Sequence, residues 1–330
     1  MAQVKSLIGR RPDLTGEELV RRLVVPSRFV EVDCDSYIPD PAFPSQTHAQ
    51  QAARACIEHA RSRRRPHKPT GLYFDGGYGV GKTHLLAAIA TGAGEKAMFC
   101  TFMQLTAVVG VLGFAAARDH CAQFRVLCID EFELDDVGNT MLVTRLMREL
   151  SDRGVIIAAT SNTPPGELGQ GRFAAEDFLR EIQSLSAIFE VVRIEGADYR
   201  QHAGTVSPLP VEDSVVQERT CADNATCDDW NALLADLSHV HPAWYGAYVE
   251  GVATVGLTGI TPVPDEAHAL RIVAFVDRLY DQNTSVVFSG IPIEKIFSEQ
   301  MMRGGYRKKY LRTLSRLGAM AVSTSAEATD

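Results

Sequence analysis

Residues 76–83 carry the pattern of a phosphate-binding loop. The run Gly76-Gly77-Tyr78-Gly79-Val80-Gly81-Lys82-Thr83 matches G-x-x-x-x-G-K-[ST] and lies between an apolar run and a helical pattern. Glycines let backbone N–H groups turn inward around a phosphate without a clashing Cβ atom. We expect Lys82 to reach the β- and γ-phosphates, the Thr83 hydroxyl to ligate Mg²⁺, and the adjacent His84 to line the same nucleotide site. The alternative is a glycine-rich turn that precedes Lys-Thr by chance.

Two adjacent carboxylates end a second apolar run, Val126-Leu127-Cys128-Ile129-Asp130-Glu131. Two acids at the end of a buried strand are costly unless a cation lies beside them, and a Mg²⁺–nucleotide complex is the natural partner. We expect Asp130 to hold the ion through water and Glu131 to polarise the attacking water. The alternative is a strand that runs into an acidic loop, since Glu133, Asp135 and Asp136 follow.

The run Thr160-Ser161-Asn162 ends the next apolar segment. We expect its strand to lie beside the strand that precedes the phosphate loop, so that the Asn162 amide orients water against the γ-phosphate. The alternative is a turn residue before Pro164-Pro165, a setting in which asparagine is common.

An arginine placed at the developing charge speeds phosphoryl transfer by about 10³–10⁵. Arg172, between the Asn162 strand and the next helix, is the first candidate for this finger, and Arg145 and Arg180 follow it. Arg316, on the last predicted helix, is a candidate second sensor; the alternative is that it lies on a solvated helix face.

These residues need a parallel sheet to position them. The pattern predicts strands at 72–75, 97–102, 126–130, 155–160 and 189–194, with helices at 82–91, 104–117, 139–151 and 175–186. Near-continuous apolar strands that alternate with helices indicate an α/β fold with helices on both faces of a parallel sheet, here the sheet of a P-loop NTPase. We expect this core to occupy residues 25–200, after an N-terminal helical segment at 1–24 with a Thr15/Glu18 capping box. Within the core, Ser45 is expected to cap a helix that runs to about residue 61.

A smaller C-terminal α/β region, a lid or partner-binding region, is expected over residues 201–330. Its elements are an extended run at 252–263, helices at 266–280 and 306–320, and a strand at 285–289. The acidic stretch 205–240 is predicted to be a linker with one partly exposed helix near 233–237.

The composition excludes several classes of protein. With 45% hydrophobic and 22% charged residues, the chain is typical of soluble globular proteins. Its longest apolar run, 107–117, is too short for a transmembrane helix, and its start lacks the pattern of a signal peptide. Seven cysteines without paired spacing fit a reducing cytosol, and no zinc-ligand spacing is present. The net charge of −8 argues against a protein that coats nucleic acid, so nucleic acid is not expected as a partner.

The ordered motifs resemble the ZapE family, AAA+-type cell-division ATPases of bacteria with mitochondrial relatives, and are most similar to its actinobacterial branch. The resemblance spans about residues 28–320. It rests on the phosphate loop and on the runs 127–132, 159–162 with Pro164-Pro165, 198–200, and 315–317 with Met320, supported by 37–40 and 276–281. It implies hydrolysis of ATP with Mg²⁺, contact with the tubulin-like division-ring protein, and a cytoplasmic location peripheral to the inner face of the membrane. An arginine that acts in trans would further require a homo-oligomer.

Two other functions stay open. A helicase-loader-like AAA+ ATPase acting on DNA or replication proteins would need a basic surface, for which only 61–68 and 303–316 are candidates. Residues 61–68 fit a solvated linker better than a contact with phosphate or acidic lipid. A nucleotide-gated adaptor with little turnover is the other alternative, against which the presence of Glu131 argues.

Overall fold

The computed structural model describes residues 5–12, 14–62, 71–133, 137–165, 168, 186–197 and 208–321. The chain divides into two compact units, Leu14–Arg200 and a second unit that combines Met1–Asp13 with Gln201–Asp330. Within the described residues, no helix is long and apolar enough to cross a membrane. All seven cysteines are described, and none of them forms a disulfide.

The first unit is built on a five-stranded sheet in which every neighbouring pair is parallel. Its strands are β1 (Gly71–Gly76), β2 (Ala97–Thr101), β3 (Val126–Asp130), β4 (Ile156–Ser161) and β5 (Phe189–Ile194), in the order β2-β3-β4-β1-β5. The strand before Asn162 therefore lies beside the strand before the phosphate loop, as the sequence predicted. Leu72 to Asp75 pair in register with Ala158 to Ser161.

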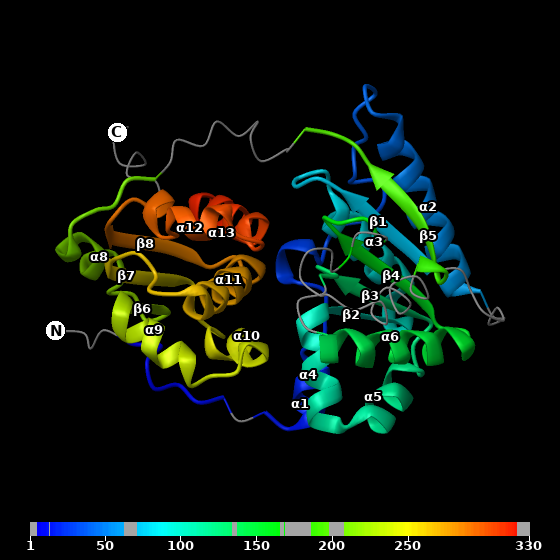
Figure 1. Cartoon of the computed structure of the whole chain (residues 1–330), viewed down its shortest axis with the longest axis horizontal. Coiled ribbons are helices and arrows are strands. Elements are labelled where there is room, and N and C mark those ends of the chain that lie inside the picture. The colour runs from blue at the N-terminus through cyan, green and yellow to red at the C-terminus, as the bar shows by residue number, and fades with distance from the viewer. Residues whose placement is uncertain are drawn as a thin grey trace. The chain divides into compact units, whose positions relative to one another are not determined.

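Helices cover both faces of this sheet (Figure 1). One face packs against α2 (Pro44–Arg61) and α3 (Lys82–Ala93), and the other against α4 (Phe102–Leu112) and α6 (Val137–Asp152). The alternation of β1 explains this arrangement, because Leu72 and Phe74 join the core under α2 and α3, while Tyr73 makes edge contacts with Phe132 and Phe189 on the opposite face. The α/β P-loop fold predicted from the sequence is confirmed.

The helices around this sheet depart from the prediction in two places. The helix expected at 104–117 is two helices, α4 and α5 (Phe114–Cys121), which meet at Gly113 with φ 80°. Helix α2 begins at Pro44 rather than being capped by Ser45, whose hydroxyl instead accepts a hydrogen bond from the Glu195 N–H. Helix α1 (Gly16–Arg21) has the predicted capping box, and the helix expected at 175–186 lies almost entirely outside the described residues.

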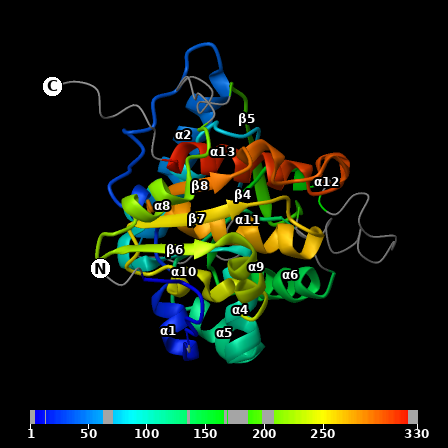
Figure 2. The same ribbon diagram turned by 90° about the vertical axis from the view of Figure 1, so that its left-hand side faces the viewer.

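The second unit has its own parallel sheet, β6 (Ala225–Asp229), β7 (Thr254–Ile260) and β8 (Ser285–Gly290), whose three strands run in one direction in Figure 2. Its helices are α8 (Asp213–Arg219), α9 (Trp230–Ser238), α10 (Tyr245–Tyr248), α11 (Glu266–Asp281), α12 (Glu299–Arg303) and α13 (Arg307–Met320). Helices α9, α11 and α13 share one core with Val255, Leu257 and Phe288. Helix α8 packs closely over Gly256, where a Cβ atom would lie 2.9 Å from Val216.

The acidic stretch 205–240 is more ordered than predicted, because it contains α8, β6 and α9. The carboxylate of Asp228, at the end of β6, is buried. It accepts hydrogen bonds from the Ser6 hydroxyl and from the Leu7 N–H at 3.0 Å. Arg11 binds Asp236 at 2.7 Å in the same unit. The segment before α1 therefore packs against the C-terminal residues and pairs with Asp228 and Asp236. The acidic residues that led to the linker prediction thus include two with partners in the fold.

Arg316 does not lie on a solvated helix face, since it is only 6% exposed. Its guanidinium binds the carboxylate of Asp277 on α11 and lies over the ring of Tyr280. Arg312, one turn earlier on α13, donates to the same carboxylate at 2.8 Å. In this structure the candidate second sensor is thus held by a buried ion pair within its own unit.

Candidate nucleotide site

The phosphate loop leads from β1 directly into α3. Gly81, the N-cap of α3, has φ 87°, and Gly79 in the preceding turn with Tyr78 has φ 70°, conformations that glycine adopts readily. Lys82 begins the helix and folds back over the loop, where its Nζ donates to the carbonyl oxygens of Gly76 at 2.8 Å and Gly77 at 2.5 Å. The loop thus closes around the lysine that the sequence assigned to the phosphates.

A segment from before α2 supports the back of this loop. The Tyr37 hydroxyl donates to the Val80 carbonyl at 3.0 Å, and burial raises the pKa of Tyr37 to about 12, so this donor stays protonated. His84, which the sequence placed in the nucleotide site, lies against this segment. Its Nε2 is 2.9 Å from the Ser36 hydroxyl, and its ring meets that of Tyr37 edge-on.

Thr83 and Asp130, the predicted metal ligands, are in contact. The Thr83 hydroxyl lies 3.1 and 3.2 Å from the two carboxylate oxygens of Asp130, which is 6% exposed at the end of β3. Hydroxyl and carboxylate oxygens are the donors that Mg²⁺ prefers, so the chemistry of this pair fits the ion. The strand β3 lies beside β4, and β4 beside β1, which brings these two ends together.

Glu131 and Asn162 complete the predicted set. Glu131 follows β3 in a left-handed conformation with φ 54°, which is rare for a residue with a side chain. The Asn162 side-chain oxygen accepts from Lys82 Nζ at 2.9 Å, and its Nδ2 donates to a carboxylate oxygen of Glu133 at 3.4 Å. The sequence places Glu133 only in an acidic loop, because nothing in it indicates the contact with Asn162.

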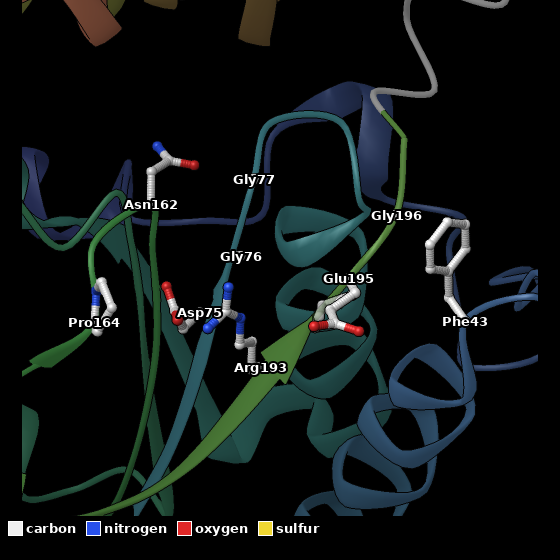
Figure 3. Close-up of a pocket in the computed structure, with 10 residues that line it drawn as sticks. Phe43, Asp75, Gly76, Gly77, Asn162, Pro164, Arg193, Glu195 and Gly196 are labelled. Carbon is white, nitrogen blue, oxygen red and sulfur yellow. The ribbon is translucent and has the colours of Figure 1, made fainter.

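A cavity of about 510 Å³ opens at the carboxyl ends of β1, β4 and β5 beside the loop (Figure 3). Its lining includes Asn162 and the first two loop glycines, and also Phe43, Asp75, Arg193 and Glu195, which the sequence analysis did not select. In Figure 3 the Arg193 side chain extends from β5 beside Asp75 of β1. Three of these residues had a signal in the sequence, because Asp75, Arg193 and Glu195 lie at or just beyond strand ends that share an edge with the phosphate loop. Phe43, which precedes α2, had none.

Of the three candidate arginine fingers, Arg145 is the one that lies within the described residues. Arg172 and Arg180 lie outside the described residues. Arg145, on α6, pairs with Glu149 at 2.9 Å and lies 4.4 Å from the centre of the Phe114 ring.

The chain matches one family model and is similar to several known proteins. The AFG1-like ATPase family model matches residues 16–212 and 205–327. The cell division protein ZapE of Escherichia coli (strain K12) is 28% identical over 300 residues, which are 77% of this chain and 79% of that protein. Lactation elevated protein 1 homolog B of Danio rerio is 24% identical over 304 residues, 73% of this chain and 59% of that protein. Among solved structures, DnaI is similar with a TM-score of 0.44 and 18% identity, over 52% of this chain and 93% of that chain.

Proposed function

Because the chain belongs to the AFG1-like ATPase family, we propose that this ATP-hydrolysing enzyme requires Mg²⁺ and uses its turnover to remodel or regulate a protein partner. One observation supports the proposal most. Side chains from the ends of β3 and β4 meet Lys82 and Thr83 at the start of α3, as the Lys82–Asn162 and Thr83–Asp130 contacts record.

Each side chain then has a role that its chemistry allows. Lys82 exchanges its carbonyl acceptors for phosphate oxygens, which form stronger charge-assisted hydrogen bonds. Thr83 and Asp130 would hold Mg²⁺, Asp130 through water, and the ion would neutralise charge that develops on the phosphates. Glu131 accepts a proton from the attacking water, while Asn162 donates from its amide toward the γ-phosphate. Arg172 stays the proposed finger, from this chain or a second copy.

We place the protein in cell division. The support is the name of the Escherichia coli relative, together with the motif resemblance over most of the chain. The proposed partner is the tubulin-like ring protein. We propose that the two proteins bind in the cytoplasm at the inner face of the membrane, and that this protein associates with the membrane only peripherally. The proposed assembly is a homo-oligomer.

Phosphate release by the purified protein tests the enzymatic part. We expect ATP-dependent release with Mg²⁺ that stops when EDTA removes the ion; release unaffected by EDTA would contradict the Mg²⁺ assignment. A pulldown with Glu131→Gln in ATP, followed by mass spectrometry, tests the partner. Recovery of the ring protein with ATP but not with ADP is the expected result, and equal recovery with both nucleotides would argue against an ATP-driven contact.

A further inference from the structure

Three hydrogen bonds join Thr160 to the turn that carries the two acids. The Thr160 hydroxyl donates to Asp130 Oδ1 at 2.5 Å and accepts from the Glu131 N–H at 3.1 Å. The Thr160 carbonyl accepts from the Phe132 N–H at 2.7 Å. Thr160 is 2% exposed near the end of β4, so these hydrogen bonds are buried.

The turn needs such support because of Glu131. Its φ of 54° places a residue with a side chain in the left-handed region, which persists only where surrounding contacts fix it. Thr160 holds the turn from one side. On the other, the buried ring of Phe132 makes edge contacts with Tyr73 and Phe102, with ring centres 6.2 and 5.3 Å away.

The hydroxyl of Thr160 uses both of its capacities in this arrangement. A carboxylate can only accept hydrogen bonds, so the Thr160 hydroxyl uses its single proton to donate to Asp130. A lone pair on the hydroxyl oxygen then accepts the hydrogen bond from the Glu131 N–H. Serine would supply the same two bonds, whereas valine has nearly the same shape and supplies neither.

We propose that Thr160 is a positioning residue for ATP hydrolysis. Its hydroxyl fixes the carboxylate of Asp130, the proposed metal ligand, and the backbone of Glu131, the proposed base. Thr160 does not itself contact the reacting atoms. This inference rests on the proposed function, and it gives a positioning role to a residue two positions before Asn162.

The test compares Thr160→Val with Thr160→Ser and with Thr144→Val. Thr144 is a buried threonine of α6 whose hydroxyl has no hydrogen-bond partner among the described residues, so its variant controls for the loss of a buried hydroxyl. We expect Thr160→Val to lower kcat by about tenfold or more and to raise the Mg²⁺ concentration for half-maximal rate, with ATP affinity changed by less than about threefold. Thr160→Ser and Thr144→Val should stay within about threefold of the wild type.

Two comparisons separate positioning from folding and from the proposed function. In the Glu131→Gln background, which binds ATP without turnover, Thr160→Val should still raise the Mg²⁺ concentration needed for half-maximal ATP binding, because Thr160 also holds Asp130. If Thr160→Val does not fold, Thr160→Cys takes its place, because cysteine has a similar volume and its thiol is a weaker hydrogen-bond donor. A kcat of Thr160→Cys equal to that of Thr160→Ser would overturn the inference. Wild-type kcat in folded Thr160→Val also overturns it, whereas a wild-type protein that releases no phosphate contradicts the proposed function instead.

Discussion

The ammonium group of Lys82 lies 2.9 Å from the side-chain oxygen of Asn162, although 80 positions separate the two residues. They meet because β1 and β4 are adjacent and parallel, so that the residues following each strand share one edge of the sheet. Oxygen atoms of Gly76, Gly77 and Asn162 accept hydrogen bonds from the lysine. A bound phosphate would offer the ammonium group charged oxygens, which form stronger hydrogen bonds than these neutral ones.

Removal of this ammonium should abolish nucleotide binding. We expect Lys82→Ala to bind ATP too weakly to measure by calorimetry, because no other side chain in the loop carries a positive charge. Lys96→Ala is the control, since Lys96 is exposed after α3 and donates to the Arg61 carbonyl. Wild-type affinity in a folded Lys82→Ala protein would contradict the assignment.

Glu131→Gln should bind ATP normally and stop turnover. Glutamine keeps the shape but cannot take a proton from water, which costs a general-base reaction about 10²–10⁴ in kcat. Phosphate release and ATP binding are measured on the same sample, with Glu190→Gln, an exposed position on β5, as the control. Unchanged hydrolysis by Glu131→Gln would remove this residue from its role.

Asn162→Ala should lower kcat by about 10²–10³ and reduce the preference for ATP over ADP, because it removes a donor toward the γ-phosphate. Its partner Glu133 can be tested in parallel. Glu133→Gln still offers an oxygen to the Asn162 Nδ2 and should be mild, whereas Glu133→Leu should reduce kcat. If the ratio of ATP affinity to ADP affinity is the same in Asn162→Ala as in the wild type, the sensor role is excluded.

Gly81→Ala should destabilise the protein before any nucleotide is added. Gly81 has φ 87°, and an added Cβ atom would lie 2.4 Å from the Tyr37 ring. The expected cost is about 1–3 kcal/mol in the free energy of unfolding, measured by denaturant titration. Gly77→Ala is the matched control, because a Cβ atom added there would have no neighbour within 4 Å and the φ of Gly77 is not positive. Similar stability of both variants would show that Tyr37 can move aside.

The stability of the protein should depend on pH through His84. Burial lowers the pKa of this imidazole below 6.5, and the hydrogen bond with the Asp33 carbonyl only partly offsets the effect. The folded state therefore binds fewer protons than the unfolded chain just below that pH. The contribution to stability is full above about pH 6.5 and is lost as the pH falls through the folded pKa.

Thermal unfolding at about pH 7.5 and 5.5 measures this dependence. The Tm of the wild type should fall more than that of His84→Gln over this range. His48→Gln, on the exposed side of α2, should behave as the wild type. The same pH dependence in His84→Gln would assign the titration to other groups.

Much of this site was predictable from the sequence because its residues lie where parallel strands end. Asp130, Glu131 and Asn162 each follow an apolar run, and strand order then determines which of them meet Lys82. Thr160 and Glu133 were not predictable in the same way, because their contacts depend on how the chain turns after β3.

The fold likewise has parts that the sequence predicts and parts that it does not. The strands of the first sheet lie within two residues of their predicted bounds, since continuous apolar runs mark them. The break at Gly113 and the strand β6 were missed. Glycine is compatible with both a helix and a break, and Asp228 receives its partners from residues more than 200 positions earlier.

The assignment of residues 5–12 to the same unit as 208–321 has a topological consequence. The polypeptide crosses between the units twice, once near residue 13 and once near residue 200, so the ATPase sheet is an insertion within the sequence of its companion. Cutting the chain at one of these two connections should therefore leave the units covalently joined through the other.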